Sequence, residues 1–371
     1  MEKKYNEADR RLKVNTVTYG AVINALAKSG ESGAAEKAEE MLRTMIDRYR
    51  SGDNDVKPNT ILCTSVIDAW TRSGERKAAS RSEEILMLME ELYKLGNKDV
   101  QPNVNIYSTL INVWAKSGEK GSAYRAEHIL SEMERRCRTG EFHLKPNIVT
   151  YNVVISALAK SNDPDSAEKA EDVLRNMLER CQLSGNNYEN VVKPNTISFT
   201  TVIDAWAKSG QRSAASRAEC ILLLMQEQCA KGMLDVKPDT RAYTAVINAC
   251  AATKYKEDKN DALKIAFNVF KQMTSQNGIS PNEYMYTILL SACDHLLPKE
   301  DEESRFSVAK ALFEKYCEAG FVNDFVLTKL RKTVVTAKRY IFLVGSFERS
   351  AARLPVHWTR NILDGGGRQR E

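Results

Sequence analysis

Basic side chains recur along the chain at nearly constant intervals of 44, 44, 44 and 48 residues. They form what we call the basic column: Lys28, Arg72, Lys116, Lys160 and Lys208. Lys and Arg residues aligned on one face of a protein can contact successive phosphates of a nucleic-acid strand. Basic residues near helix C-termini also favour the helix dipole, and the two interpretations are compatible. The column ends at the next two equivalent positions, which hold Ala252 and His295.

Residue types that carry catalysis or bind metals are present but scattered. The histidines have no cysteine or acidic partner at metal-ligand spacing, and they are His128, His143, His295 and His357. The cysteines form no CxxC, and the deaminase pattern of HxE followed by PCxxC is missing. Neither a phosphate-binding loop nor a nucleophile elbow occurs. We therefore predict that the chain is not an enzyme, and that it holds no metal and no cofactor.

Charge is unevenly distributed along the sequence. The formal net charge is +5, but residues 331–371 carry nine basic and three acidic side chains, so the preceding residues sum to about −1. If the chain binds nucleic acid, its positive charge must lie on one face. The composition, with 43% hydrophobic residues, 28% charged residues and nine prolines, is typical of an ordered helical protein. The sequence contains no apolar run long enough to cross a bilayer, so we predict no membrane partner.

The positions of the basic column belong to a longer internal repeat. The segment "NTVTYGAVINALAKSG" at Asn15 returns as "NTILCTSVIDAWTRSG" at Asn59 and "NTISFTTVIDAWAKSG" at Asn195. One aromatic or apolar position recurs at intervals of 44, 44, 44, 48, 44, 43 and 41 residues. We call it the aromatic position, and it holds Tyr19, Cys63, Tyr107, Tyr151, Phe199, Tyr243, Tyr286 and Leu327. Such a period indicates a repeat architecture.

Each repeat predicts a pair of helices. Apolar residues in 151–158 follow the i, i+3, i+4, i+7 pattern of an amphipathic helix, which ends near a Ser-Gly pair such as Ser29-Gly30 in most copies. A second periodic segment follows, as in 167–177, and the repeat then ends at Lys-Pro-Asn or a variant of it. One pair cannot bury its apolar faces alone, whereas stacked pairs share a continuous core.

The predicted fold class is therefore all-α, an α-solenoid superhelix of stacked helix-turn-helix repeats. The predicted organisation is an N-terminal lead-in over 1–14, seven repeats over 15–323, and a degenerate eighth repeat with a basic C-terminal tail over 324–371. The apolar runs "RYIFLVG" and "RLPVHWTRNI" in the tail are expected to cap the last repeat. No targeting segment is visible ahead of the first repeat.

The segments "VTYNVVISALAKS" at 149–161, "KAEDVLRNM" at 169–177 and "KPN" at 193–195 resemble the pentatricopeptide repeat family. The resemblance covers roughly residues 15–323, although repeats of about 44 residues are unusually long for that family. It implies sequence-specific binding of single-stranded RNA, one base per repeat. It also implies a place in a mitochondrion or chloroplast, in RNA processing, stability or translation, with other RNA-processing proteins as further partners.

The resemblance also assigns roles to individual residues. In the family, one base-recognition residue directly follows the aromatic position and the other ends the repeat after Lys-Pro. We call the two a recognition pair, and the implied pairs are Gly20 with Asn59, Thr64 with Asn103, Ser108 with Asn147, Asn152 with Asn195, Thr200 with Asp239, Thr244 with Asn282, and Thr287 with Asn323. The residue two before the aromatic position, here called the stacking position, sandwiches bases in the family. It is aliphatic at Val17, Ile61, Val149 and Ile197, and elsewhere it holds Asn105, Arg241, Tyr284 and Phe325.

The chemistry of these pairs suits base edges. A hydroxyl beside an Asn amide offers both donors and acceptors and suits adenine, whereas an ionised Asp only accepts and suits the N1–H and amino donors of guanine. An Asn–Asn pair favours a pyrimidine in the family's pattern, and Gly20 makes the first repeat nearly indifferent. The predicted register, 5′ to 3′, is any-A-A-pyrimidine-G-A-A.

Several of these residues also have simpler structural interpretations. Each repeat-ending Asn or Asp is a residue type that caps helices and forms turns. Trp70, Trp114 and Trp206 share one first-helix position and are expected in the core rather than as stacking platforms for bases. Glu36, Glu39 and Glu40 are expected on a solvated outer face.

Two other functions stay open at this point. Helical repeats also form protein-binding scaffolds, although a peptide groove has no reason to repeat polar pairs and basic residues in register. A nuclease or editing site in the tail is the third hypothesis, and the tail offers it only Glu348, Asp364 and Glu371 as carboxylate side chains.

Overall fold

The computed structural model describes residues 14–161, 163–183, 191–232, 236–275, 280–334, 336–345 and 350–361. Almost all of the predicted lead-in and the end of the basic tail lie outside the described residues. Within them the chain forms α-helices and short 3₁₀ turns and no strand, which confirms the predicted all-α class of stacked helix pairs. No helix in this part of the chain is both long enough and apolar enough to span a membrane.

The chain separates into two compact units, and the division falls within one helix, at residues 174–178. The first unit contains α2 (Thr16–Ser29), α3 (Ala34–Arg50), α4 (Thr60–Ser73), α5 (Ala78–Lys94), α6 (Val104–Ser117), α7 (Ser122–Arg138), α8 (Ile148–Lys160) and most of α9 (Ser166–Leu183). The second contains α10 (Thr196–Ser209), α11 (Ala214–Ala230), α12 (Thr240–Ala251), α13 (Lys259–Ser275), α14 (Glu283–Leu296), α15 (Glu302–Ala319), α16 (Asp324–Thr333), α17 (Ala337–Val344) and α18 (Val356–Thr359).

The first helix of each repeat has signals at both ends. Asn59 begins α4 as an N-cap whose side chain accepts a hydrogen bond from the Leu62 N–H, and Gly74 ends the helix with φ of 65°, a left-handed conformation that favours glycine. The predicted apolar face of α8 is buried, since Tyr151, Val154, Ile155 and Leu158 are at most 4% exposed. Periodicity and capping residues together explain why these segments form helices of nearly equal length.

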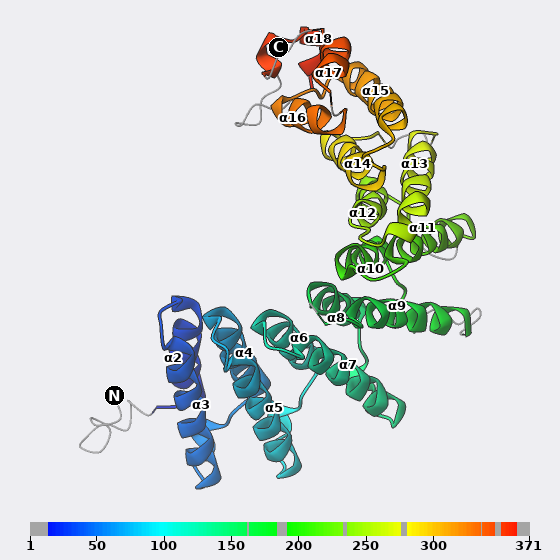
Figure 1. The fold of residues 1–371 in the computed structure, drawn as a ribbon. Helices are drawn as coiled ribbons and strands as arrows, with labels where there is room; N and C mark the ends of the chain where they lie inside the picture. Colours follow the sequence, from blue (N-terminus) through cyan, green and yellow to red (C-terminus); the bar gives the residue numbers. More distant parts are fainter. Residues whose placement is uncertain are drawn as a thin grey trace. The chain divides into compact units, whose positions relative to one another are not determined.

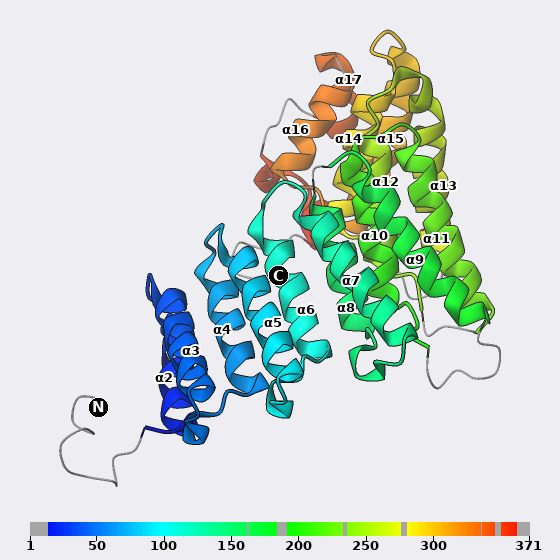
Figure 2. The same ribbon diagram turned by 90° about the horizontal axis from the view of Figure 1, so that it is seen from below.

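Neighbouring repeats pack in the same way within each unit (Figures 1 and 2). In the first unit, α2 contacts α4, and α4 contacts α6, so the first helices form one continuous layer. The second helices α3, α5 and α7 each pack on the first helix of their own repeat and on the first helix of the next repeat. In the second unit, α10, α12, α14 and α16 follow the same rule. The layer of first helices is therefore the surface that lines up one equivalent position per repeat.

The additional length of these repeats is ordered around 3₁₀ turns in the first unit. The second helices α3, α5 and α7 each run for 17 residues. Each is followed by a short turn, and the turns are η2 (Asn54–Val56), η3 (Lys98–Val100) and η4 (Phe142–Leu144). The last residue of each turn is fully buried: Val56, Val100 and Leu144. The extra residues therefore lengthen the second helix and anchor the connecting loop, while the layer of first helices keeps its packing.

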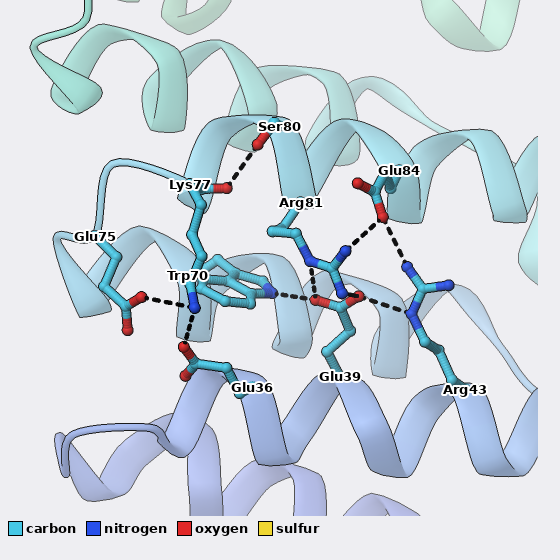
Figure 3. Close-up of polar contacts among 9 residues, drawn as sticks. All are labelled: Glu36, Glu39, Arg43, Trp70, Glu75, Lys77, Ser80, Arg81 and Glu84. Atoms are coloured by element: carbon cyan, nitrogen blue, oxygen red, sulfur yellow. Dashed lines mark hydrogen bonds and ion pairs between the residues drawn. The ribbon is translucent and has the colours of Figure 1, made fainter.

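The expectation that Glu39 lies on a solvated face is wrong. Glu39 is 2% exposed, and its carboxylate accepts hydrogen bonds from Trp70 Nε1 at 2.9 Å, Arg81 Nη2 at 2.6 Å and Arg43 Nε at 2.8 Å. Figure 3 shows these side chains converging from α3, α4 and α5. Charged partners and the indole N–H satisfy the hydrogen-bonding capacity of the buried carboxylate. Trp70 lies in the core as expected, at 1% exposure.

The C-terminal segment packs on the last helix pair. The shorter pair α16 and α17 contacts α15, and α18 also packs on α15. The carbonyl of Trp358 accepts a hydrogen bond from the Val322 N–H at 2.9 Å. The Trp358 ring packs edge-on against the Phe313 ring, with centroids 5.6 Å apart. The described part of the tail therefore covers the end of the repeats, as expected from its apolar runs.

Candidate nucleic-acid interface

The stacking position is solvent-exposed in every repeat. Its aliphatic residues are the predicted base-sandwiching residues, and their exposed fractions are 76% for Val17, 70% for Ile61, and 58% for both Val149 and Ile197. The aromatic residues at this position are also exposed, at 58% for Tyr284 and 53% for Phe325. Large apolar side chains placed in water at the same point of six of the eight first helices have no role in the core. Their exposure fits a surface that receives flat apolar ligands.

The second member of every recognition pair is a helix N-cap. Asn or Asp Oδ1 accepts a hydrogen bond of 2.9 to 3.1 Å from the backbone N–H three residues later. The residues concerned are Asn59, Asn103, Asn147, Asn195, Asp239, Asn282 and Asn323. The structural interpretation of these residues is thus confirmed. Because Oδ1 is held by the helix terminus, the Asn amide group, or the second oxygen of Asp239, is the end of the side chain that points away from the cap.

Threonine at the first position of a pair uses its own proton within the helix. The hydroxyl groups of Thr64, Thr200 and Thr244 donate to the carbonyl oxygens four residues earlier, at 2.8, 2.8 and 2.6 Å. A threonine bound in this way presents only the lone pairs of its oxygen to a further partner. A Thr–Asn pair therefore offers an acceptor from the hydroxyl and a donor from the amide.

The other first members differ among themselves. Ser108 Oγ lies 2.8 Å from Thr150 Oγ1, the hydroxyl that completes the capping box of Asn147. Gly20 is buried, and a Cβ added there would lie 3.2 Å from Leu62 Cδ2. Asn152 is half-buried in the first unit, whereas its partner Asn195 belongs to the second.

Three first helices of the second unit, α10, α12 and α14, border a pocket of about 260 Å³. It contains three predicted recognition residues, Thr200, Thr244 and Asn282, and two stacking-position residues, Arg241 and Tyr284. These five residues lie on or directly before α10, α12 and α14, the first helices of three consecutive repeats, which Figure 1 labels. The pocket therefore brings together the two sets of residues that sequence comparison assigned separately.

The pocket also contains polar residues that the sequence analysis did not identify. Asp204 and Asn248 line it and stand four residues after Thr200 and Thr244, one helical turn further along the same face. The equivalent residues in the other repeats are also polar, namely Asn24, Asp68, Asn112, Ser156 and Ser291. The recurrence of a polar residue at this one position of the first helices was the available signal.

The positive charges of the basic column act on the pKa of carboxylates at this additional position. Burial raises the pKa of Asp68, and the positive charges of Arg72 and Lys116 oppose that shift. Burial likewise raises the pKa of Asp204, and Lys208 and Arg241 oppose it. The basic side chains are thus within electrostatic range of the polar face of the first helices.

The basic column itself lies at the surface. Lys28, Arg72, Lys116, Lys160 and Lys208 are all exposed, each in the last turn of its helix. Arg72 donates from Nη1 to the carbonyl of Ala27 in the preceding repeat at 3.0 Å. This position satisfies the helix-dipole interpretation and also leaves the side chains at the edge of the first-helix layer.

Among the described residues, His, Cys, Asp and Glu form no group of three that could hold a metal ion. His295, at the basic-column position of its repeat, contacts the carbonyl of Thr253 through Nε2 at 2.9 Å.

Comparison with solved structures finds helical-repeat proteins at low identity. A crystal structure of the pentatricopeptide repeat protein PPR10 from maize matches with 18% identity and a TM-score of 0.35, over 87% of this chain and 47% of that one. A structure of PPR10 in complex with an 18-nt psaJ RNA element matches with 16% identity and a TM-score of 0.29, over 92% and 55%. The chain spans about half the length of these structures. A comparison with curated protein sequences gives no match.

Family profiles give a direct assignment. The profile of the pentatricopeptide repeat domain matches residues 92–161 and 223–295, and the profile of the PPR repeat matches residues 17–49 and 149–181. Together these matches cover more than half of the chain and fall on the helix pairs described above. The chain therefore belongs to the pentatricopeptide repeat family.

Proposed function

We propose that this protein binds single-stranded RNA along its layer of first helices, with one base opposite each recognition pair. The pocket between α10, α12 and α14 is the observation that carries the proposal. Thr200, Thr244 and Asn282 meet there with Arg241 and Tyr284, so polar groups for a base edge lie beside side chains for its face. Membership of the pentatricopeptide repeat family also supports RNA binding.

The hydrogen bonds that the pair members make to the helix backbone support the predicted register. A Thr–Asn pair presents an oxygen acceptor and an amide donor, which complement the N6 amino group and the N1 acceptor of adenine. In the Thr200–Asp239 pair both groups accept, which complements the N1–H and N2 amino donors of guanine. The proposed register is any-A-A-pyrimidine-G-A-A. Cytosine presents the same donor and acceptor as adenine, so base size must contribute at the Thr–Asn repeats.

Selection of RNA from a random single-stranded pool tests this function. Enrichment of the proposed register supports it, whereas tight binding to a peptide or protein partner without RNA enrichment supports a scaffold instead. Enrichment of C in place of A at the Thr–Asn repeats would overturn the base assignment and leave RNA binding intact.

Asp239→Asn tests the register at one position. Asn caps helices as well as Asp does, so the variant keeps the N-cap of α12 and changes only the outer group. The preferred base at the fifth position should change from G to A, with the other positions unchanged. Asp301→Asn is the matched control, since Asp301 caps α15 outside the proposed site and should change no preference.

We further propose that the protein acts in a mitochondrion or chloroplast, in RNA processing, stability or translation, by binding without chemical change to the RNA. Family membership supports this placement. Crosslinking in cells should recover organellar transcripts that contain the register, and recovery of cytosolic messages alone would contradict it. End-labelled RNA incubated with the protein should keep its length and sequence.

A further inference from the structure

In the recognition pair of the seventh repeat, other residues of the protein contact both members. The hydroxyl of Tyr316, on α15, donates to Thr287 Oγ1 at 3.1 Å. Asn323 caps α16 through Oδ1, and its Nδ2 donates to Oε1 of Glu283. Thr287 thus uses one of its two lone pairs, and Asn323 one of its two amide N–H bonds, in contacts with the protein rather than with a base edge.

The residue at position 283 explains why the Asn323 amide binds to the protein. The equivalent residues Thr16, Thr60 and Thr196 donate to backbone carbonyls of the next connecting loop, at 3.0, 3.1 and 3.5 Å. A threonine bound to the loop backbone does not take up the capping Asn. Glutamate at this position is longer and carries an acceptor, and it reaches the Asn323 amide instead.

The residue at position 316 explains the contact with Thr287. It lies 29 residues after the first member of the pair, and the corresponding residues for Thr64, Thr200 and Thr244 are Tyr93, Cys229 and Met273. Cys229 and Met273 are not strong hydrogen-bond donors, and Tyr93 is only half-buried, with Lys98 Nζ 4.3 Å from its ring centre. Tyr316 is fully buried in an aromatic cluster with Tyr286, where its hydroxyl reaches Thr287. Tyr316 and Glu283 therefore contact the two members of this recognition pair.

The same repeat has aromatic side chains at the stacking positions that flank it. Tyr284 and Phe325 are both more than half exposed, whereas Val or Ile occupies this position at residues 17, 61, 149 and 197. Asn248 Nδ2 lies 3.5 Å from the Tyr284 hydroxyl, at the wall of the pocket, and Lys329 Nζ lies 5.6 Å from the ring centre of Phe325. Aromatic rings stack on every base, because each base has a flat face whatever its edge.

We propose that the seventh repeat is a base-neutral clamp, which holds a nucleotide by stacking on Tyr284 and Phe325 and does not distinguish its edge. The inference rests on the proposed RNA binding and changes the register at its last position, to any-A-A-pyrimidine-G-A-any. Only the second to sixth repeats then prefer a particular base, and the first and seventh repeats accept any base.

Binding of short RNAs in solution tests the clamp. The RNAs carry the register with A, C, G or U at the seventh position, or an abasic nucleotide there. The four bases should bind within about twofold of one another, and the abasic RNA should bind at least about fivefold more weakly, since one stacked base contributes a measurable share of affinity. Phe325→Ala should weaken binding of the four RNAs equally and should reduce the penalty of the abasic site.

A gain of specificity provides the second test. Glu283→Thr restores the residue of the other repeats, and Tyr316→Phe removes the hydroxyl while keeping the ring. The double variant should acquire a preference for A at the seventh position, and Glu283→Thr alone should acquire part of it if the double variant folds poorly. Asp301→Asn, on α15 outside the pair, is the control and should leave the seventh position indifferent.

The outcomes separate this inference from the function on which it rests. A preference for A at the seventh position of the unaltered protein, or no loss of affinity with the abasic RNA, overturns the clamp while RNA binding stands. Absence of binding to any of these RNAs, with a folded protein, overturns the proposed function itself.

Discussion

Trp70 Nε1 donates a hydrogen bond of 2.9 Å to Oε2 of Glu39, which lies in the second helix of the preceding repeat. Arg81, from the second helix of Trp70's own repeat, binds the other carboxylate oxygen. The next interface repeats this arrangement, with Trp114 and Arg125 on Glu83. The buried carboxylate thus links both helices of the next repeat to one residue, which fixes how consecutive repeats pack.

Glu39→Ala should destabilise the first unit by about 2 kcal/mol, because it leaves the buried indole N–H of Trp70 without an acceptor. Arg43 and Arg81 are partly exposed and can be solvated by water, which keeps the loss below that of a fully buried ion pair. Urea unfolding followed by circular dichroism measures the change. Glu84→Ala is the control, since Glu84 binds the same arginines at the surface and should cost less than about 1 kcal/mol. Equal midpoints for the two variants would contradict a special role for Glu39.

The repeat and its helices could be predicted because their signals are local. The apolar spacing in 151–158 and the caps at Asn59 and Gly74 lie within one helix, and repetition of the same pattern along the chain makes them unambiguous. The partners of Glu39 could not be predicted, because Trp70 and Arg81 lie 31 and 42 residues away and a single helix only shows that Glu39 is charged.

The candidate site shows the same limit. Comparison of equivalent positions in the repeats identifies only residue types, so it assigned Thr287 and Asn323 as a recognition pair in the same way as the other six pairs. Their occupation by Tyr316 and Glu283 depends on side-chain reach between helices, which no alignment of repeats contains. The exposure of the stacking position is likewise a property of packing, although its apolar residues were visible in the sequence.

Ile197→Ser should weaken RNA binding and leave stability unchanged. The side chain is 58% exposed, so its removal costs little core packing, whereas it would remove an apolar contact to a base. We expect a loss of affinity of about fivefold, near the lower end of the range for one stacked base. Fluorescence anisotropy with labelled RNA and thermal unfolding measure the two quantities. Leu223→Ser is the matched control, because Leu223 is 46% exposed on the second helix α11 and should affect neither. A similar loss of affinity in both variants would count against the stacking position.

Arg305→Met should unfold the end of the second unit. Arg305 is 1% exposed, and its guanidinium donates to the carbonyls of Asp294, Leu297 and Thr333 at 3.0 to 3.1 Å and to the Asp294 carboxylate at 2.6 Å. Removing the charge leaves these acceptors without a donor, at a cost of about 3 to 5 kcal/mol. Hydrogen exchange should show faster exchange in α15 to α17 than in α10. Lys315→Met, at an exposed position of the same helix, should leave exchange unchanged, and protection that survives Arg305→Met would show that the tail is held by other contacts.

Asp204→Asn should stabilise the second unit at neutral pH and strengthen RNA binding. Burial raises the pKa of Asp204 in the folded protein above its ordinary value of 3.8, so folding disfavours the ionised form. The stability linked to this group is present below the unfolded pKa and is lost as pH rises through the folded pKa. Asn avoids that loss, so the urea midpoint of the variant should exceed that of the unaltered protein at pH 7, and the difference should shrink as pH falls toward 4.

The same substitution of Asp204 removes a negative charge from a pocket near the positive charges of Lys208 and Arg241, which favours a phosphate. Glu227→Gln removes an exposed charge from α11 and should change neither quantity appreciably. Weaker RNA binding by Asp204→Asn would instead mean that this carboxylate contacts a base directly, as a third member of its recognition pair.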